Sequence, residues 1–407
     1  MELSMSQRQA VTKKKAVAYK RSSRSGKTRI LNEVVDLTGW HRNYARAALA
    51  EALRPKVLKP RAPRAPKYGP QIIACLIMCW TLTRTPAGKR LAPMLASLVP
   101  LLRRDGDITL TDRDATLLMQ MSAATIDRRL LPERIRLDLR GRSHTKPGTL
   151  LKSQIAIRTW AQWDEDKPGF LEIDLVGHEG GNSSGEFCFT LTATDIATGW
   201  TVNRSVKNKA MVWVVEAIDY VIARFPFPIL GIDSDNGSEF INAHLFNYCI
   251  DNKITFTRSR AGNSNDGAHV EQKNWTHVRE LVGYLRFDTE DELAKLNAIW
   301  ELDATYTNYL LAQQKLIFKQ RNGAKVTKKY DPAKTPRERA AAYECVTAES
   351  RLLMDAAMAL VRPGTLYRTI QGLTTELERM ALTKAPAPIK PSVNRVFNQS
   401  LKAKVSR

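Results

Sequence analysis

The spacing of apolar and polar residues is most regular between positions 170 and 285. Apolar runs bounded by turn residues predict strands at 170–178, 186–196, 200–206, 229–234 and 253–258. Apolar residues three or four positions apart predict helices at 209–224, 237–251 and 268–285. Three strands are followed by alternating helices and strands. This order predicts an α/β domain, with helices on a five-stranded mixed sheet, over residues 151–290.

The N-terminal 54 residues predict a basic arm and two short helices. Residues 1–28 are rich in Lys and Arg, and we expect them to be mobile until a polyanion is present. Helices at 29–37 and 40–49 are separated by a Thr38-Gly39 turn, a pattern typical of a helix-turn-helix. In that interpretation Arg42, Asn43 and Arg46 read DNA. An ordinary helical hairpin is the alternative.

A proline-rich basic linker at 55–69 precedes a second helical segment at 70–150. Its helices are predicted at 71–84, 89–104 and 112–120, followed by one from 123 that Ser122 caps. On that last helix Arg128 and Arg129 would lie on the outer face, so we predict a second DNA-binding module. Cys75 and Cys79 sit in an apolar helix and are predicted to be buried rather than metal ligands.

Residues 291–383 predict a mostly helical and basic C-terminal region. A helix is expected over 289–318, and further helices over 336–383. The basic stretch 319–339 fits either a hairpin or loop lying on DNA or an exposed linker. The proline-containing tail 384–407 is expected to be disordered.

The N-terminal region of the chain is basic and its central domain is acidic. The net charge is +22, and residues 1–70 hold 17 Lys and Arg against 4 Asp and Glu. Residues 160–283 hold 10 basic and 17 acidic residues. Basic segments attract a polyanion and an acidic centre attracts cations, as an enzyme acting on DNA with metal ions requires. Without a membrane-length apolar run, a signal sequence or paired cysteines, we expect a cytoplasmic protein associated with the nucleoid.

Three acids in the central domain are candidate metal ligands. Asp174 lies within the first strand, Asp235 at the end of the fourth, and Glu271 on the last helix. Oxygen ligands of this kind suit a pair of hard divalent cations. Individually, Asp235 could be a turn residue and Glu271 a solvated acid of a first helical turn. Asp233 alternates with Asp235 along the strand and therefore shares its face.

The motifs around these acids resemble a known family. Ser234-Asp-Asn-Gly-Ser-Glu-Phe240 and Val270-Glu-Gln-Lys-Asn274 resemble the catalytic core of retroviral integrases and insertion-sequence transposases. That core has an RNase H-like fold and a D,D-35-E triad, which maps onto Asp174, Asp235 and Glu271. The resemblance implies two Mg²⁺ ions per active site, with Mn²⁺ as a substitute.

Two features of the chain depart from the family pattern. Trp275 stands where the family has a Lys that touches DNA ends, and the His/Cys zinc module of the family is missing. DNA contact by this helix is therefore expected from Lys273, Asn274 and Arg279, or from His277.

The resemblance implies a DNA transposase that binds element ends, cleaves at their 3′ ends and joins them to target DNA. Its expected partners are double-stranded DNA and further copies of the chain. The need for an ATPase partner is left open. Two alternatives are a nuclease with the same core that does not join strands, and a non-catalytic DNA-binding regulator.

Overall fold

The structure, a computed structural model, describes residues 3–54, 67–137, 167–234, 243–258, 268–322 and 325–384. The chain forms two compact units, Met1–Lys67 and Tyr68–Arg407, which we describe separately. None of the described helices is both long enough and apolar enough to cross a membrane.

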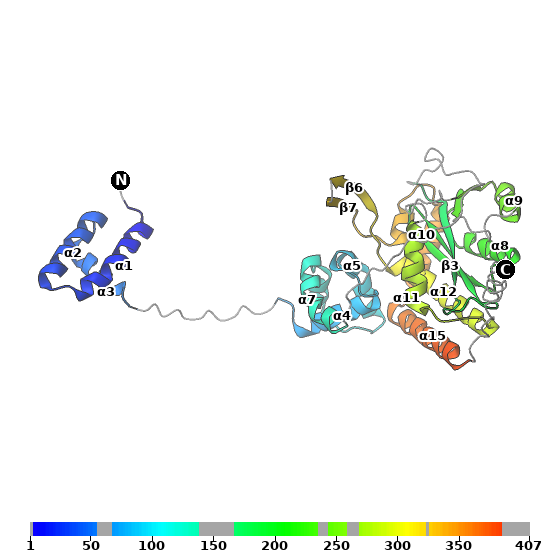
Figure 1. Ribbon diagram of the computed structural model, residues 1–407, viewed down its shortest axis with the longest axis horizontal. Coiled ribbons are helices and arrows are strands. Elements are labelled where there is room, and N and C mark those ends of the chain that lie inside the picture. Colours follow the sequence, from blue (N-terminus) through cyan, green and yellow to red (C-terminus); the bar gives the residue numbers. More distant parts are fainter. Residues whose placement is uncertain are drawn as a thin grey trace, which may run out of the picture. The chain divides into compact units, whose positions relative to one another are not determined.

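The N-terminal unit contains α1 (Met5–Arg21), α2 (Arg24–Thr38) and α3 (Arg42–Glu51) (Figure 1). The prediction of a mobile arm over residues 1–28 is wrong for the described part. Ser4 caps α1 in a reciprocal pair with Gln7, and Ala16 is buried. The turn at Gly39 is confirmed, because Gly39 has φ +69° and ends α2. The three helices pack around Ala16, Leu31, Val34, Ala45 and Leu49.

A second group of helices opens the larger unit. It contains α4 (Pro70–Leu82), α5 (Gly88–Arg104), α6 (Asp112–Met119) and α7 (Ala123–Arg136), close to the predicted ranges. The Ser122 hydroxyl accepts the N–H of Thr125, which confirms the predicted cap. Cys75 and Cys79 are buried in the apolar core of these helices, as predicted.

The sheet has five strands, β1 (Phe170–Gly177), β2 (Phe189–Asp195), β3 (Thr201–Val206), β4 (Gly231–Ser234) and β5 (Thr255–Arg258). Their order is β3-β2-β1-β4-β5. Strand β1 is central, antiparallel to β2 and parallel to β4, so the predicted mixed sheet is confirmed.

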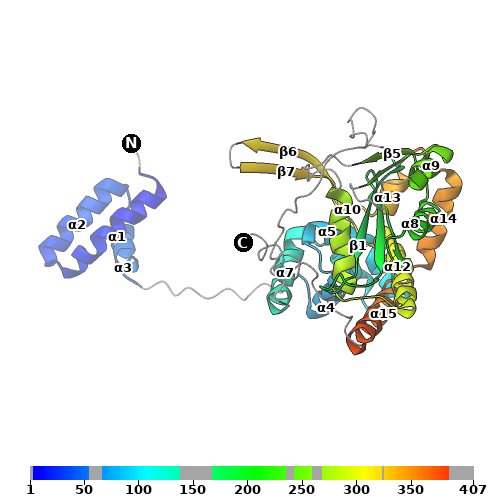
Figure 2. The ribbon, with the colours of Figure 1, turned by 45° about the vertical axis from the view of Figure 1, so that its right-hand side comes forward.

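The two faces of the sheet differ in chemistry. On one face, Leu171 and Ile173 pack in an apolar core with α8 (Met211–Ile222) and α9 (Ala243–Asp251). On the other face lies a helix in three parts, α10 (Ala268–Lys273), the π-helix η1 (Asn274–Arg279) and α11 (Glu280–Val282). Figure 2 shows α10 and α8 on opposite sides of β1. Helix α12 (Glu290–Leu310) packs beside β3.

The helix predicted over 289–318 ends at Leu310, so the prediction is wrong for residues 311–318. Leu311 is extended, and Gln313 instead pairs with Lys334 at the base of a hairpin. The hairpin consists of β6 (Leu316–Asn322) and β7 (Lys325–Tyr330), and it projects beside α10 (Figure 2). Helices α13 (Pro336–Ala341), α14 (Ala348–Leu360) and α15 (Pro363–Thr383) follow.

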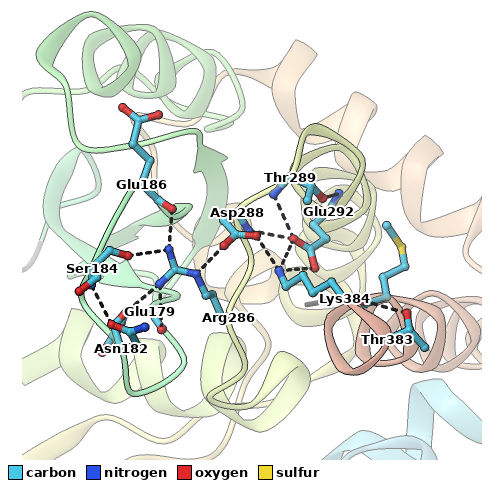
Figure 3. Close-up of polar contacts among 11 residues, drawn as sticks. Glu179, Asn182, Ser184, Glu186, Arg286, Asp288, Thr289, Glu292, Thr383 and Lys384 are labelled. Carbon is cyan, nitrogen blue, oxygen red and sulfur yellow. Dashed lines mark hydrogen bonds and ion pairs between the residues drawn. The ribbon is translucent and has the colours of Figure 1, made fainter. Parts of the chain in front are cut away.

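A polar cluster joins three distant segments of the larger unit (Figure 3). The Arg286 guanidinium bonds the Asp288 carboxylate and donates to carbonyls of the β1–β2 connection, those of Asn182, Ser184 and Glu186. Lys384, at the end of α15, donates to Asp288 at 2.7 Å and to Glu292 at 2.8 Å. Glu292 also accepts the N–H groups of Asp288 and Thr289 at the start of α12.

Candidate active site

Two acids of β1 lie on the face that α10 covers. Side chains alternate along a strand, so Glu172 and Asp174 point away from the apolar core that holds Leu171 and Ile173. Glu172 is buried, with 1% of its surface exposed, whereas Asp174 is half-buried. Asp174 is therefore the acid of this pair that a substrate can approach.

Both acids hold the helix above them. The Glu172 carboxylate accepts the N–H of Val270 at 3.1 Å. The Asp174 Oδ2 accepts from the Asn274 side-chain Nδ2 at 2.6 Å. Val270 and Asn274 are one helical turn apart, so β1 fixes α10 at two points. Glu271 directly follows Val270 and therefore enters the helix between them.

The other predicted ligands are only partly located. Asp235 lies outside the described residues, and its chain neighbour Ser234 is the register partner of Ile173, next to Asp174. The backbone of Glu271 lies in α10, but its side chain is also outside the described part. Among the side chains that the structure describes, no group of three or more His, Cys, Asp and Glu could hold a metal ion.

The chemistry of the donors at β1 suits a hard cation. The Asp174 carboxylate is half-exposed, and the Oδ1 of Asn274 beside it is buried without a hydrogen-bond partner in the described structure. These are oxygen atoms, the ligand type that Mg²⁺ prefers. The residues present at this point therefore fit a magnesium site.

Two further residues near the site are structural. Asp233 is the register partner of Glu172, is buried, and accepts the Thr257 hydroxyl at 2.6 Å. His178 is buried, with its Nε2 2.7 Å from the Thr190 hydroxyl. Burial, and then the charge of Arg279, lowers the pKa of His178 to about 3, so the imidazole is neutral near pH 7.

A buried charge cluster anchors η1, the middle part of the helix that packs on β1. Asp303 of α12 forms an ion pair with Arg84, which follows α4. The other carboxylate oxygen of Asp303, Oδ2, lies 3.5 Å from Nδ1 of His277 in η1. His277 also contacts the Thr307 hydroxyl at 3.1 Å, and Arg84 donates to the Thr276 carbonyl. The helical segment α4–α7 is thereby joined directly to the helix that carries Glu271.

Burial governs protonation in this cluster. It lowers the pKa of His277 to about 4. For Asp303, burial acts to raise the pKa, but the charge of Arg84 and the contact with His277 hold it below its usual value. Arg84 and Asp303 were not identified from the sequence, because each is an isolated charged residue whose partner lies more than two hundred positions away.

Lys273, expected to contact DNA, is buried in this structure, and its role in binding DNA stays a prediction. Only 7% of its surface is exposed, and its Nζ donates to the Gln313 Oε1 at 2.6 Å. His277 is buried too. Asn274 uses its amide on Asp174, and Arg279 is half-buried and donates to the Gly177 carbonyl at 2.9 Å. Among the described side chains of this helix, those of Gln272, Trp275 and Glu280 are exposed, Trp275 at 55%.

The remaining predicted DNA contacts lie on surfaces. Arg42, Asn43 and Arg46 are exposed on α3, and Arg42 pairs with Asn32 of α2. Arg128 and Arg129 are exposed on α7. Their role in binding DNA stays a prediction.

Comparison with known proteins agrees with this architecture. The integrase core domain family matches residues 164–264. The catalytic core domain of BIV integrase aligns at a TM-score of 0.27 and 19% identity, covering 42% of this chain and 91% of that one. The HTLV-2 integrase catalytic core domain in complex with magnesium, in its dimeric form, aligns at a TM-score of 0.27 and 15% identity. The alignment covers 36% of this chain and 90% of that one.

The five-stranded mixed sheet and the family match over residues 164–264 identify an integrase core domain within this chain. One relative extends over most of the chain. The uncharacterized protein y4rM of Sinorhizobium fredii (strain NBRC 101917 / NGR234) is 38% identical over 322 residues, 78% of this chain and 90% of that protein. The chain belongs to the same family as y4rM.

Proposed function

We propose that this protein is a DNA transposase, which cleaves at the 3′ ends of a DNA element and joins those ends to target DNA. The observation that carries the proposal is the pair of hydrogen bonds that the Val270 N–H and the Asn274 side-chain amide donate to the carboxylates of Glu172 and Asp174. They support the proposal because they hold the start of the helix that contains Glu271 against β1, which carries the half-buried Asp174 carboxylate.

In this proposal Asp174, Asp235 and Glu271 hold two Mg²⁺ ions, for which Mn²⁺ can substitute. Bound in a pair, such ions activate the attacking oxygen and stabilise the leaving oxygen of a phosphodiester. The Asn274 amide donates to Oδ2 of Asp174 and the Leu175 N–H to Oδ1, and together they orient the carboxylate. The nucleophile would be water for cleavage and the 3′-hydroxyl for joining.

DNA binding is assigned to the basic surfaces outside the core. Arg42, Asn43 and Arg46 would face one duplex segment, and Arg128 and Arg129 another. Two ends must be held together during joining, so we expect several copies of the chain on DNA, at the nucleoid. A nuclease that never joins strands is the second candidate, and assays on precut ends separate the two.

The test is Asp174→Asn. The amide keeps the size of the side chain and can still contact Asn274, but it removes the negative charge that a cation requires. We expect DNA binding to persist while cleavage and joining in Mg²⁺ fall by at least about a thousandfold, a loss of ~4 kcal/mol of transition-state stabilisation.

Asp251→Asn, an exposed acid of α9, is the control and should leave both activities unchanged. Full joining by the Asp174→Asn protein would remove this acid from the mechanism.

A further inference from the structure

An exposed aromatic pair lies beside the proposed metal site. Trp275 follows Asn274, the residue that holds Asp174, and is one helical turn after Glu271. It therefore lies on the same side of the helix as the Glu271 position. The neighbouring ring is that of Tyr284, 61% exposed, whose centroid is 6.5 Å from that of Trp275 at an interplanar angle of 54°.

Arg279 supports one ring of this pair. The Arg279 guanidinium lies over the Tyr284 ring, 4.6 Å from its centroid. Arg279 is itself fixed, because its Nη2 donates to the Gly177 carbonyl on β1 and its Nη1 to that of Gly283. Arg279 thus links the Tyr284 ring to the strand that carries Asp174, while both rings stay more than half exposed.

The size and charge of this surface indicate its ligand. Among the described residues from 268 to 289, Trp275 and Tyr284 are the exposed large hydrophobic side chains. Two rings are far too little for a stable protein interface, which buries about 800 Å² per partner. Uncharged rings also give no attraction to a phosphate. A nucleobase is small enough for two rings and needs no charged partner, because every base has a flat face that stacks on an aromatic side chain.

We propose that Trp275, assisted by Tyr284, forms a stacking platform for one unpaired base of the DNA strand that is cut and joined. This inference rests on the proposed function and adds the ligand of a surface next to the catalytic acids. Stacking would hold the strand end out of the duplex so that its phosphodiester reaches Asp174. A base inside a duplex cannot offer its face to a side chain.

The test is a double-mutant cycle between the protein and the DNA. Duplexes from either side of the coding sequence are made with a single abasic residue at each of the terminal positions in turn. Their dissociation constants are measured for the full-length wild type, Trp275→Ala and Trp275→Phe. At one position we expect base removal to weaken wild-type binding about five- to a hundredfold and to leave Trp275→Ala binding unaffected. Trp275→Phe should retain part of the effect.

Trp213→Ala is the matched control, since Trp213 lies on α8 and is 40% exposed. It should show the wild-type response. Equal sensitivity to base removal in wild type and Trp275→Ala at every position would overturn the platform. A change of oligomeric state in Trp275→Ala without coupling to any base would overturn it as well, in favour of a contact between copies. Coupling without joining activity would instead preserve the platform and refute the proposed function.

Discussion

Replacing Glu172 tests whether β1 positions the catalytic helix. The carboxylate accepts the N–H of Val270, and Val270 is only 3% exposed, so water does not readily replace the lost acceptor. Leaving a buried N–H unpaired costs about 1–3 kcal/mol. Glu172→Leu should therefore reduce the free energy of unfolding by roughly that amount. Glu172→Gln keeps an oxygen acceptor and should cost about 1 kcal/mol or less.

Urea unfolding gives the stability, and strand joining as a function of Mg²⁺ concentration gives the effect on the site. We expect Glu172→Leu to need more Mg²⁺ because α10 no longer starts at a fixed position, and Glu172→Gln to behave nearly as wild type.

Glu292 provides the control, since it is equally buried and accepts backbone N–H groups at the start of α12. Glu292→Leu should lose stability without a change in the Mg²⁺ requirement. If Glu172→Gln joined strands as poorly as Glu172→Leu, the negative charge would matter rather than the acceptor, and the positioning role would be refuted.

Three other outcomes are expected. Burial keeps the pKa of His178 at about 3 and that of His277 at about 4, so the unfolded chain binds these protons first. Stability should thus fall as the pH drops below about 6.5, by ~2 kcal/mol per histidine at pH 5, and a flat pH profile of urea unfolding would contradict this. Asp303→Ala leaves Arg84 without its partner and should cost about 3–5 kcal/mol, measured by the same method, with a loss below about 1 kcal/mol refuting a buried pair. The three lysines of β7 are all exposed, and changing them to alanine should reduce the slope of log Kd for DNA against log salt concentration by up to about three. An unchanged slope would exclude the hairpin from phosphate contact.

Local pattern was enough to predict the sheet. Apolar runs separated by turns such as that at Gly199 define strands regardless of what packs on them, and β1 to β5 fall within a few residues of the predicted ranges. Helix α1 could not be predicted in this way. Apolar residues such as Met5 and Val17 are exposed on it, and Ala16 becomes a core residue because α2 and α3 close over it.

The site was predictable in part. Strand β1 holds two acids, Glu172 and Asp174, and the resemblance singled out Asp174 as the candidate ligand and supplied its two companions. Glu172 had no such signal. Its importance comes from a hydrogen bond to Val270, nearly a hundred residues away, which no local pattern encodes.

Lys273 and Trp275 show why charge was a poor guide to the surface of the catalytic helix. The sequence favours Lys273 as the DNA contact, yet its position on the helix turns it toward Gln313 and away from solvent. Burial, reinforced by the charge of Arg90, lowers the pKa of Lys273 to about 7, so the side chain can shed its proton near neutral pH and the cost of burying it falls. Two positions later the helix faces outward, and Trp275 is exposed although apolar. On a helix packed against a sheet, angular position decides which side chain meets the substrate, so an uncharged ring can face DNA while a cation supports the fold.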